Sequence, residues 1–428
     1  MKEYAGKVLM LVENCFPADT RVRNEAFTLA ANGFKVSVIA LRGQAETPRE
    51  VVNGVTVYRI PRLTLFEKLP GVKPSGIKAL LNKLRVVVGY LAEYIYFTSA
   101  CLVVSAYVAV KEGCDVVHAH NPPDMLFVVG AIHKLFRRKF VFDHHDLSAE
   151  LYLSRYKKTT DDAVTRALRF LEKLSVKLAD VVIATNESYR AIDIQRNGID
   201  PDKVFIVRNG PDPARVRLVE PDRRLRSMGR TILGYVGAMN PQDGVDYLLR
   251  ALSYLAHDLN RTDFYCVLIG DGDSRAALES QAVELKIADR VLFTGFIPDE
   301  DLFRYLSAAD ICLDPNPSSP LNDVSTWIKV MEYMALGKPI ISFDLKETRT
   351  SAADAAVFVP PNDEARFAEA IVQLMDDPAR RRTMGEYGVT RVQNQLGWHV
   401  TSQNLVKSYG RLFAKVPFEP VGRPATTL

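Results

Sequence analysis

Short runs of β-branched residues alternate with longer amphipathic stretches along most of this chain, and no other feature restricts its fold as strongly. This alternation is typical of βαβ units wound around parallel sheets. One series of runs extends from residues 8–12 to residues 204–208, and a second extends from residues 232–236 to residues 356–359. A polar, charged stretch ending at Arg230 separates them. We therefore predict an α/β protein with two doubly wound parallel sheets in tandem.

The break between the two series sets the predicted domain limits. It begins at the turn-forming sequence Asn-Gly-Pro of residues 209–211. We predict an N-terminal domain over residues 1–208 and a C-terminal domain over residues 209–397. Apolar positions at helical spacing predict a further helix over residues 398–413. The tail over residues 417–428 is expected to be irregular.

The charge balance and the cysteines argue against two classes of function. Lys and Arg number 55 and Asp and Glu 51 among 428 residues, so the chain lacks the basic field that drives nucleic-acid binding. The five cysteines are scattered, with no CxxC pair and no Cys/His cluster at the spacing of metal ligands. We expect reduced thiols in a cytoplasmic protein and no structural metal site.

Residues 86–110 form an apolar segment that is long enough to span a bilayer. Glu93 near its middle and its many Tyr, Ser and Thr residues favour a buried or interfacial helix, with a membrane-spanning helix as the alternative. Basic residues flank the segment and suggest either peripheral contact with anionic lipid or a solvated basic face. These residues are Lys78, Lys83, Arg85, Lys134, Arg137, Arg138 and Lys139.

A helix following the strand of residues 311–314 carries the strongest functional signal. Ser325 is a favourable N-cap, Gly337 suits the left-handed position after a helix, and Pro339 prevents continuation, so we expect about three turns. Ligands bind outside the carboxyl ends of strands in open parallel sheets. The amino end of this helix is therefore expected to face a crevice between the domains and to bind a diphosphate.

Lys329 and Glu332 lie three residues apart on this helix and share a face. A carboxylate at Glu332 would accept hydrogen bonds from both hydroxyls of a ribose, and Lys329 would compensate the charge of the phosphates. The alternative is an ordinary ion pair between the two on the helix surface.

Histidines end two strands of the predicted N-terminal sheet. His118 and His120 point the same way in their strand, and we expect only His120, which is further out, to reach the crevice. The next strand ends in Asp-His-His-Asp at residues 143–146, where Asp143 is expected to close the turn. A metal cluster of these His and Asp residues is the minor alternative.

The loop after the first strand leads into a helix that begins near Asp19, Thr20 and Arg21. Asp19 or Thr20 is a suitable cap, and the amino end of the helix is expected to point at the crevice as a second phosphate site. Arg21 is then either a direct ligand contact or a residue of the helix surface.

The helix of residues 325–336 resembles the donor-binding element of family 4 glycosyltransferases, and it matches a branch with a Ser/Thr-x-x-Lys-x-x-Glu arrangement. The resemblance extends over nearly the whole chain. Other segments similar to those of the family are Asn-Gly-Pro-Asp at 209–212, residues 234–237 with 244–251, Ile-Gly-Asp-Gly-Asp at 269–273 and Phe-Thr-Gly-Phe-Ile-Pro at 293–298.

The resemblance implies the GT-B fold, in which two Rossmann-like domains face one another and a C-terminal helix, here residues 398–416, crosses back to the N-domain. It implies a retaining enzyme that moves a hexose-type sugar from a UDP- or GDP-linked donor to a lipid-linked or polysaccharide acceptor. Such an enzyme would serve envelope or exopolysaccharide synthesis and lie in the cytoplasm or at the inner face of the membrane. No metal and no nucleic acid are expected.

Residue by residue, the resemblance assigns catalytic roles to His120, Lys329 and Glu332. The expected donor-binding residues are Gly237, Asn240, Gly270, Gly295, Phe296, Ile297, Ser325, Thr326, Lys329 and Glu332. The expected acceptor-side residues are Arg21, Asn121, His144 and His145.

Three positions depart from the family pattern. Ala238 and Asp243 stand where many relatives have an Arg and a Lys that grip the diphosphate, and Val324 replaces the first Glu of a Glu-x7-Glu pattern. Each lost contact would be worth about 1.5 to 3 kcal/mol. These departures suggest as an alternative a catalytically silent relative that binds a nucleotide sugar or a partner glycosyltransferase as a scaffold. A separate alternative is a nucleotide-sugar epimerase on the same fold.

Overall fold

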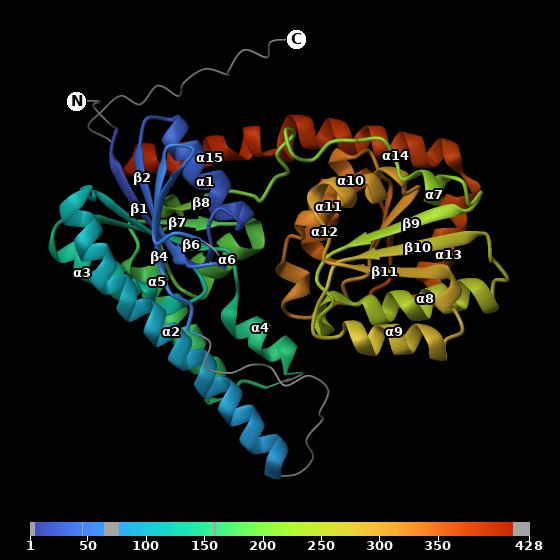
Figure 1. Ribbon diagram of the computed structural model, residues 1–428, viewed down its shortest axis with the longest axis horizontal. Helices are drawn as coiled ribbons and strands as arrows, with labels where there is room; N and C mark the ends of the chain where they lie inside the picture. The colour runs from blue at the N-terminus through green and yellow to red at the C-terminus, as the bar shows by residue number, and fades with distance from the viewer. Residues whose placement is uncertain (1–4, 45, 64–76, 157–159, 414–428) are drawn as a thin grey trace. The chain divides into compact units, whose positions relative to one another are not determined.

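The computed structural model describes residues 5–44, 46–63, 77–156 and 160–413, with side chains omitted for residues 77–87. The chain forms two compact units, each with its own parallel sheet (Figure 1). Unit 1 comprises Met1–Ala149, Asp162–Val207 and Ser402–Leu428. Unit 2 comprises Glu150–Asp161 and Arg208–Thr401.

Unit 1 contains an eight-stranded sheet in the order β3-β4-β2-β1-β5-β6-β7-β8. Only β3 runs antiparallel, against β4, and the other pairs are parallel. The strands are β1 (Lys7–Cys15), β2 (Lys35–Leu41), β3 (Arg49–Val52), β4 (Val55–Ile60), β5 (Val116–His120), β6 (Lys139–His144), β7 (Val181–Ala184) and β8 (Val204–Ile206).

The helices of unit 1 connect these parallel strands. The first begins as predicted, because the Asp19 side chain accepts a hydrogen bond of 3.0 Å from Val22 N, and it ends before Gly33 at φ +84°. The helices are α1 (Thr20–Ala31), α2 (Ile77–Lys111), α3 (Phe127–Leu135), α5 (Ala163–Leu178) and α6 (Glu187–Gln195).

Unit 2 contains a six-stranded sheet that is parallel throughout, in the order β11-β10-β9-β12-β13-β14. The strands are β9 (Thr231–Val236), β10 (Phe264–Ile269), β11 (Val291–Gly295), β12 (Ile311–Asp314), β13 (Ile340–Phe343) and β14 (Ala356–Val359). The helices are α7 (Arg223–Arg226), α8 (Val245–His257), α9 (Arg275–Glu284), α10 (Asp299–Ala308), α11 (Ile328–Ala335), α12 (Lys346–Ala352), α13 (Glu364–Asp376) and α14 (Pro378–Arg391).

Helices cover both faces of the sheet in unit 2 (Figure 1), as the alternation of runs predicts. Leu233 and Tyr235 of β9 pack into one apolar cluster with α8 and α13, while Ile232, the residue before Leu233, joins a second cluster with α10 and α11. Neighbouring residues of a strand point to opposite faces, so a strand buried on both faces is apolar throughout.

Two helices contribute to both units. α4 (Ser148–Arg155) begins in unit 1 and continues in unit 2, and α15 (Trp398–Leu412) begins in unit 2 and has its later residues in unit 1. The expected tail of residues 417–428 lies outside the described residues.

α2 is the long helix that extends past the sheet of unit 1 (Figure 1). Its stretch Val88–Lys111 is long and apolar enough to cross a membrane by length and composition. A single helix of this kind is also found in the core of soluble proteins, and Phe97, Cys101 and Val108 of this helix are buried. All five cysteines are free thiols, as predicted.

The order of strands reverses once in each sheet. In unit 1 the reversal lies between β1 and β5, and in unit 2 it lies between β9 and β12. Loops leave such a point in opposite directions at the carboxyl ends of the two strands, which opens a crevice for a ligand. The fold therefore places one candidate ligand site at the carboxyl ends of β1 and β5 and another at those of β9 and β12.

Candidate active site

The helix predicted to begin at Ser325 begins instead at Ile328, and it has 8 residues, about two turns. The Ser325 hydroxyl donates to the carbonyl of Leu321 at 2.7 Å, and Ser325 follows a short 3-10 helix, Asn322–Val324. Trp327 occupies the N-cap position with extended backbone. The prediction of Ser325 as N-cap is wrong because its hydroxyl closes the preceding turn. The left-handed Gly337, φ +63°, ends the helix as predicted.

α11 is nevertheless fixed at the switch point of unit 2. The Tyr333 hydroxyl accepts from Val236 N, the last residue of β9, at 2.8 Å. Lys329 Nζ lies 3.1 Å from Oδ1 of Asp314, the last residue of β12, and donates to Oδ1 of Asn316. The amino end of α11, where the helix dipole favours an anion, therefore lies beside the carboxyl ends of both strands.

Lys329 and Glu332 are both 8% exposed, and each pairs with another residue rather than with its neighbour on the helix. Arg215 Nη1 donates to Glu332 Oε1 at 2.9 Å, and Arg215 also contacts both carboxylate oxygens of Asp299 at 2.7 and 2.9 Å. Burial raises the pKa of Glu332, and Arg215 opposes this rise. The simple surface ion pair considered from the sequence is therefore wrong, and reasoning from the sequence missed Arg215.

The glycines predicted to bind the donor lie together at the neighbouring strand ends. Gly270 N donates to the carbonyl of Gly295 at 3.1 Å, and Gly237 N donates to the carbonyl of Ile269 at 3.0 Å. A Cβ on Gly270 would lie 1.9 Å from the carbonyl oxygen of Gly237. Asn240 Oδ1 accepts from Asp273 N at 3.3 Å and joins this loop to the glycine loops.

The departures from the family pattern are visible in the same loop. Asp243 Oδ2 accepts from Asn240 N at 3.0 Å and closes the turn after β9, so its carboxylate is used within the loop. Burial raises the pKa of Asp243, and Lys329 opposes the rise. Phe296, which follows β11, is 88% exposed, while Ile297 and Thr326 are half-buried.

In unit 1, His120 lies at the end of β5 and is fully buried. Its Nδ1 lies 2.9 Å from Oδ2 of Asp143, and its ring stacks on His118 with centroids 4.3 Å apart. The expectation that His120 alone emerges from the sheet is wrong, because β5 is a central strand and both rings are covered. Burial lowers the pKa of both histidines, so both are neutral. Nε2 of His120 has no hydrogen-bond partner among the described residues.

Arg21 is buried at the same strand ends. Its Nε and Nη2 each lie 2.7 Å from an oxygen of Asp143, and Nη1 donates to the carbonyl of Val207 at 3.0 Å. Nη2 also lies 3.2 Å from Glu25 Oε1. Arg21 is therefore not a surface residue, and its guanidinium is used in contacts within the protein. Asp143, which was expected only to close a turn, forms a buried ion pair with Arg21. Glu25 was missed in the sequence, although its position four residues after Arg21 in a helix could have predicted their ion pair.

His144 is separated from His120 because successive residues of β6 point to opposite faces of the sheet. His144 Nδ1 lies 2.8 Å from Asp193 Oδ1, and Nε2 lies 3.8 Å from Glu172. Burial works against a charged imidazole here, but Asp193 and Glu172 outweigh it and raise the pKa of His144 to about 10. His144 is thus the cation of a buried ion pair on the other face.

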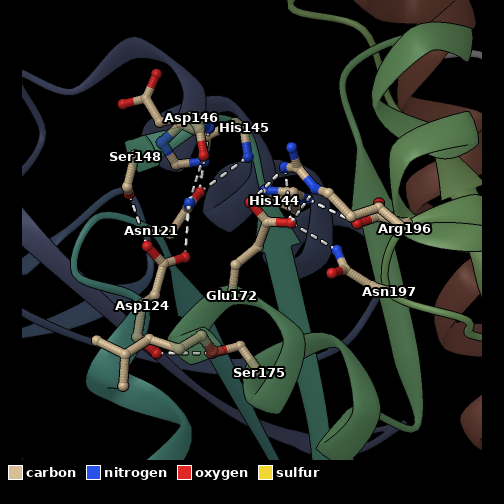
Figure 2. Close-up of polar contacts among 12 residues, drawn as sticks. Asn121, Asp124, His144, His145, Asp146, Ser148, Glu172, Ser175, Arg196 and Asn197 are labelled. Carbon is tan, nitrogen blue, oxygen red and sulfur yellow. Dashed lines mark hydrogen bonds and ion pairs between the residues drawn. The ribbon is translucent and has the colours of Figure 1, made fainter. Parts of the chain in front are cut away.

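Asn121 joins the loops that follow β5 and β6 (Figure 2). Its Nδ2 donates to Asp124 Oδ1 at 3.1 Å and to the carbonyl of Asp146 at 2.6 Å. Its Oδ1 accepts from the backbone N of His145 and Asp146 at 2.9 and 3.2 Å. The amide of Asn121 thereby fixes His145, whose ring Nδ1 lies 3.5 Å from Asp143.

A metal could be considered where Glu25, His118, His120 and Asp143 bring their ligand atoms within 4.8 Å of one another. Arg21 contacts both carboxylates of this set and supplies the positive charge they require. The metal cluster considered from the sequence, over residues 143–146, is divided by the sheet because His144 faces away.

Two family models match the chain, and together they cover most of it. "Glycosyl transferase 4-like domain" matches residues 18–210, and "Glycosyl transferases group 1" matches residues 230–377. The two α/β sheets with polar clusters at their switch points have the fold of GT-B glycosyltransferases. The chain belongs to the family 4, or group 1, glycosyltransferases, enzymes that transfer a sugar from a nucleotide donor.

Characterised relatives are distant from this chain. It is 26% identical over 406 residues to a D-inositol 3-phosphate glycosyltransferase of Thermomonospora curvata, covering 89% of this chain and 87% of that protein. It is 25% identical over 245 residues to a 2-deoxystreptamine glucosyltransferase of Streptomyces kanamyceticus, covering 56% of this chain and 60% of that protein.

Two solved structures share the fold over nearly the whole chain. Sucrose-phosphate synthase from Thermosynechococcus elongatus superposes with a TM-score of 0.74 and 22% identity, covering 96% of this chain and 100% of that one. HepE of Anabaena, in complex with UDP-glucose, superposes with a TM-score of 0.68 and 17% identity, covering 95% and 100%.

Proposed function

We propose that this chain is a retaining hexosyltransferase that moves a hexose-type sugar from a UDP- or GDP-sugar to a lipid-linked or polysaccharide acceptor. Its role would be in the synthesis of an envelope polysaccharide or exopolysaccharide. The observation that carries the proposal is the position of α11, which is held by Lys329 and Tyr333 at the switch point of unit 2.

The donor would bind at this switch point. The amino end of α11 and the ammonium of Lys329 suit a diphosphate, and Glu332, one turn further along, suits the hydroxyls of a ribose. Gly237, Gly270 and Gly295 would shape the loops that receive the nucleotide, since a Cβ on each would lie within 2.8 Å of other protein atoms and the loops could not pack so closely. The HepE complex with UDP-glucose supports a nucleotide sugar as the donor.

The sugar would be held by His120. Nδ1 of this neutral imidazole faces Asp143, and its unpaired Nε2 is suited to a hydroxyl of the transferred sugar. No residue described here is needed as a protein nucleophile. Stabilisation of the leaving diphosphate by Lys329 and the helix amino end would supply much of the rate, without a required metal.

A panel of UDP- and GDP-sugars tests the proposal. One donor should raise the melting temperature and be slowly hydrolysed, with retention at the anomeric carbon seen by NMR. Glu332→Gln should weaken that donor's binding, and His120→Ala should abolish turnover while retaining binding. His257→Ala, an exposed histidine of α8, is the matched control and should behave as wild type. Absence of stabilisation by every nucleotide sugar would refute the proposal.

The catalytically silent relative remains the second candidate because of one observation. Asp243 places a buried carboxylate in the loop after β9, where Lys329 is the cation that opposes its raised pKa. A silent protein would be stabilised by a nucleotide sugar but would show no hydrolysis and no transfer. An epimerase would differ again, since it would release an altered sugar nucleotide or free sugar without any acceptor.

The lipid-linked acceptor is supported by the exposed face of α2. Apolar side chains recur there at helical spacing along its described length: Val88, Leu91, Ile95, Val103 and Val110 are exposed. α3 packs beside α2 and ends in exposed Leu135 and Phe136, followed by the basic residues Arg137, Arg138 and Lys139. An apolar stripe with adjacent cations suits peripheral binding to an anionic membrane from the cytoplasm. Lys78, Lys83 and Arg85 lie where side chains are not described.

Sedimentation with liposomes tests the membrane contact. Wild type should bind vesicles that contain anionic lipid, and Val103→Glu should reduce binding without changing hydrolysis of the donor. Val283→Glu, at an exposed apolar position of α9, is the matched control. Equal binding of both variants, or a change of oligomeric state in Val103→Glu alone, would contradict membrane docking of this face.

A further inference from the structure

A chain of buried contacts leads from the last helix to His120. We propose that Tyr409 and Glu25 are positioning residues that hold the ring of His118, and that His118 in turn fixes the ring of His120 by stacking. The inference rests on the proposed function, because it concerns how His120 is presented to the sugar.

The first link joins α15 to β5. Tyr409 Oη and His118 Nδ1 are hydrogen-bonded at 3.0 Å, and both side chains are fully buried. Phe34 packs edge-on against the Tyr409 ring with centroids 5.3 Å apart. A buried hydroxyl that lost this partner would carry the full cost of its desolvation, so the contact is strongly favoured.

The second link holds the opposite side of the same ring. His118 Nε2 lies 3.7 Å from Glu25 Oε2, and Glu25 is itself 3.2 Å from Arg21 Nη2. Tyr409 and Glu25 thus lie at the two ring nitrogens of His118. Rotation of the ring about χ2 would break the hydrogen bond between Nδ1 and Tyr409 and would move Nε2 away from the buried Glu25 carboxylate.

The third link passes this orientation to His120. The two imidazoles stack with an interplanar angle of 25° and a centroid distance of 4.3 Å. Asp143 Oδ2 lies 2.9 Å from Nδ1 of His120, and a carboxylate at this place favours the tautomer with its proton on Nδ1 and with Nε2 as an acceptor. The plane of His120 is therefore defined by His118 on its face and by Asp143 on its edge, and its Nε2 lone pair has a fixed direction.

The reaction would depend on this direction. A hydrogen bond weakens steeply as its angle departs from linearity, so a tilted His120 would hold the sugar hydroxyl less well in the transition state. Neither Tyr409 nor Glu25 needs to touch the substrate. Tyr409 belongs to α15, the helix that begins in unit 2, so α15 contributes a residue to the cluster around His120 in unit 1.

Tyr409→Phe removes only the hydroxyl and tests the first link. We expect kcat for transfer or donor hydrolysis to fall about three- to tenfold, with the donor KM changed less than about twofold. Glu25→Gln should have a similar effect. Phe34→Leu, which loosens the packing around Tyr409 but leaves the hydroxyl, is the matched control and should lower the melting temperature without lowering kcat. Loss of stability alone in Tyr409→Phe, with kcat retained, would overturn the proposal.

A readout independent of activity separates this inference from the proposed function. In protein labelled with ¹⁵N-histidine, which has seven histidines, the ring signals of His120 report its tautomer. Tyr409→Phe should change the tautomer ratio of both His118 and His120, whereas Phe34→Leu should not. An unchanged His120 signal in Tyr409→Phe and Glu25→Gln would refute the coupling even if the wild type transfers sugar. If the wild type proves inactive, the proposed function fails while this measurement still decides the coupling.

Discussion

Lys329 is held in an ion pair with Asp314, with Nζ 3.1 Å from Oδ1, at the carboxyl end of β12. The ammonium also lies 4.9 Å from the ring centre of Tyr235 and 5.3 Å from that of Trp327. These contacts fix a buried cation where the loop after β9 lacks basic residues. In the proposed function, this lysine is a cation available to the diphosphate of the donor.

Lys329→Met is expected to raise the donor KM about 10- to 100-fold, because a charge-assisted contact with the diphosphate is lost. Stability should fall as well, since Asp314 would remain buried without its cation. Isothermal titration with the nucleoside diphosphate measures the binding. Lys338→Met, which removes hydrogen bonds to the carbonyls of Ser307 and Ala309 at 2.8 Å, is the matched control. It should destabilise the fold without weakening the nucleotide, and equal loss of affinity in both variants would contradict this role for Lys329.

Arg215→Met is expected to make donor binding more sensitive to acid. Burial already raises the pKa of Glu332, and Arg215 is the group that lowers it, so the variant should raise this pKa further. The ionised carboxylate that accepts the ribose hydroxyls would then be lost at a higher pH, and the donor KM should begin to rise earlier as the pH falls. KM measured from about pH 5.5 to about pH 8 shows the shift.

Arg304→Met is the control for Arg215, since Arg304 belongs to the adjacent ion pairs with Asp222 and Asp301 at 3.3 and 3.1 Å. Its pH profile should match that of wild type. If the donor KM of Arg215→Met begins to rise at the same pH as that of wild type, Glu332 does not bind the donor in its ionised form.

The sequence was sufficient for the fold because the signals for it are local. Strands buried on both faces must be apolar throughout, so the runs at residues 232–236 and 311–314 could be recognised without any knowledge of their partners. Gly33 and Gly337 marked helix ends because a left-handed residue after a helix favours glycine.

The polar contacts of the site could not be predicted in the same way, because their partners are distant in the sequence. Arg21 meets Asp143 across 122 residues, and Arg215 meets Glu332 across 117. Successive residues of a strand point to opposite faces of the sheet, so the sequence of β6 already indicated that His144 and Asp143 lie on opposite faces. The predicted start of α11 was wrong because the Ser325 hydroxyl donates a hydrogen bond to the carbonyl of Leu321 in the preceding turn.

His144→Gln is expected to destabilise unit 1 by about 3 kcal/mol near neutral pH, because the buried Asp193 would lose its cation, whereas Glu172 would keep its ion pair with Arg196. The pKa of His144 is raised from 6.5 in the unfolded chain to about 10 in the folded protein. The stabilisation is therefore complete below about pH 6.5 and is lost as the pH rises through about 10. Urea unfolding of the two proteins should give a difference that shrinks over this range, whereas His257→Gln should give none at any pH.

Gly270→Ala tests whether the glycine loops have to lie against one another. The new Cβ would meet the carbonyl oxygen of Gly237 at 1.9 Å and the backbone has φ +132°, so both the clash and the strain must be relieved by moving the loops after β9 and β10. Gly229→Ala is the matched control, because Gly229 is also left-handed, with φ +62°, but has nothing within 4 Å of a Cβ. The control should cost about 1 kcal/mol of stability from backbone strain and leave donor binding intact. Gly270→Ala should cost more than about 3 kcal/mol or, where the loops yield, abolish the stabilisation by the nucleotide sugar. Equal melting temperatures and equal donor affinities for the two variants would mean that the loops are free to separate, and the close approach of Gly237 and Gly270 would then play no part in donor binding.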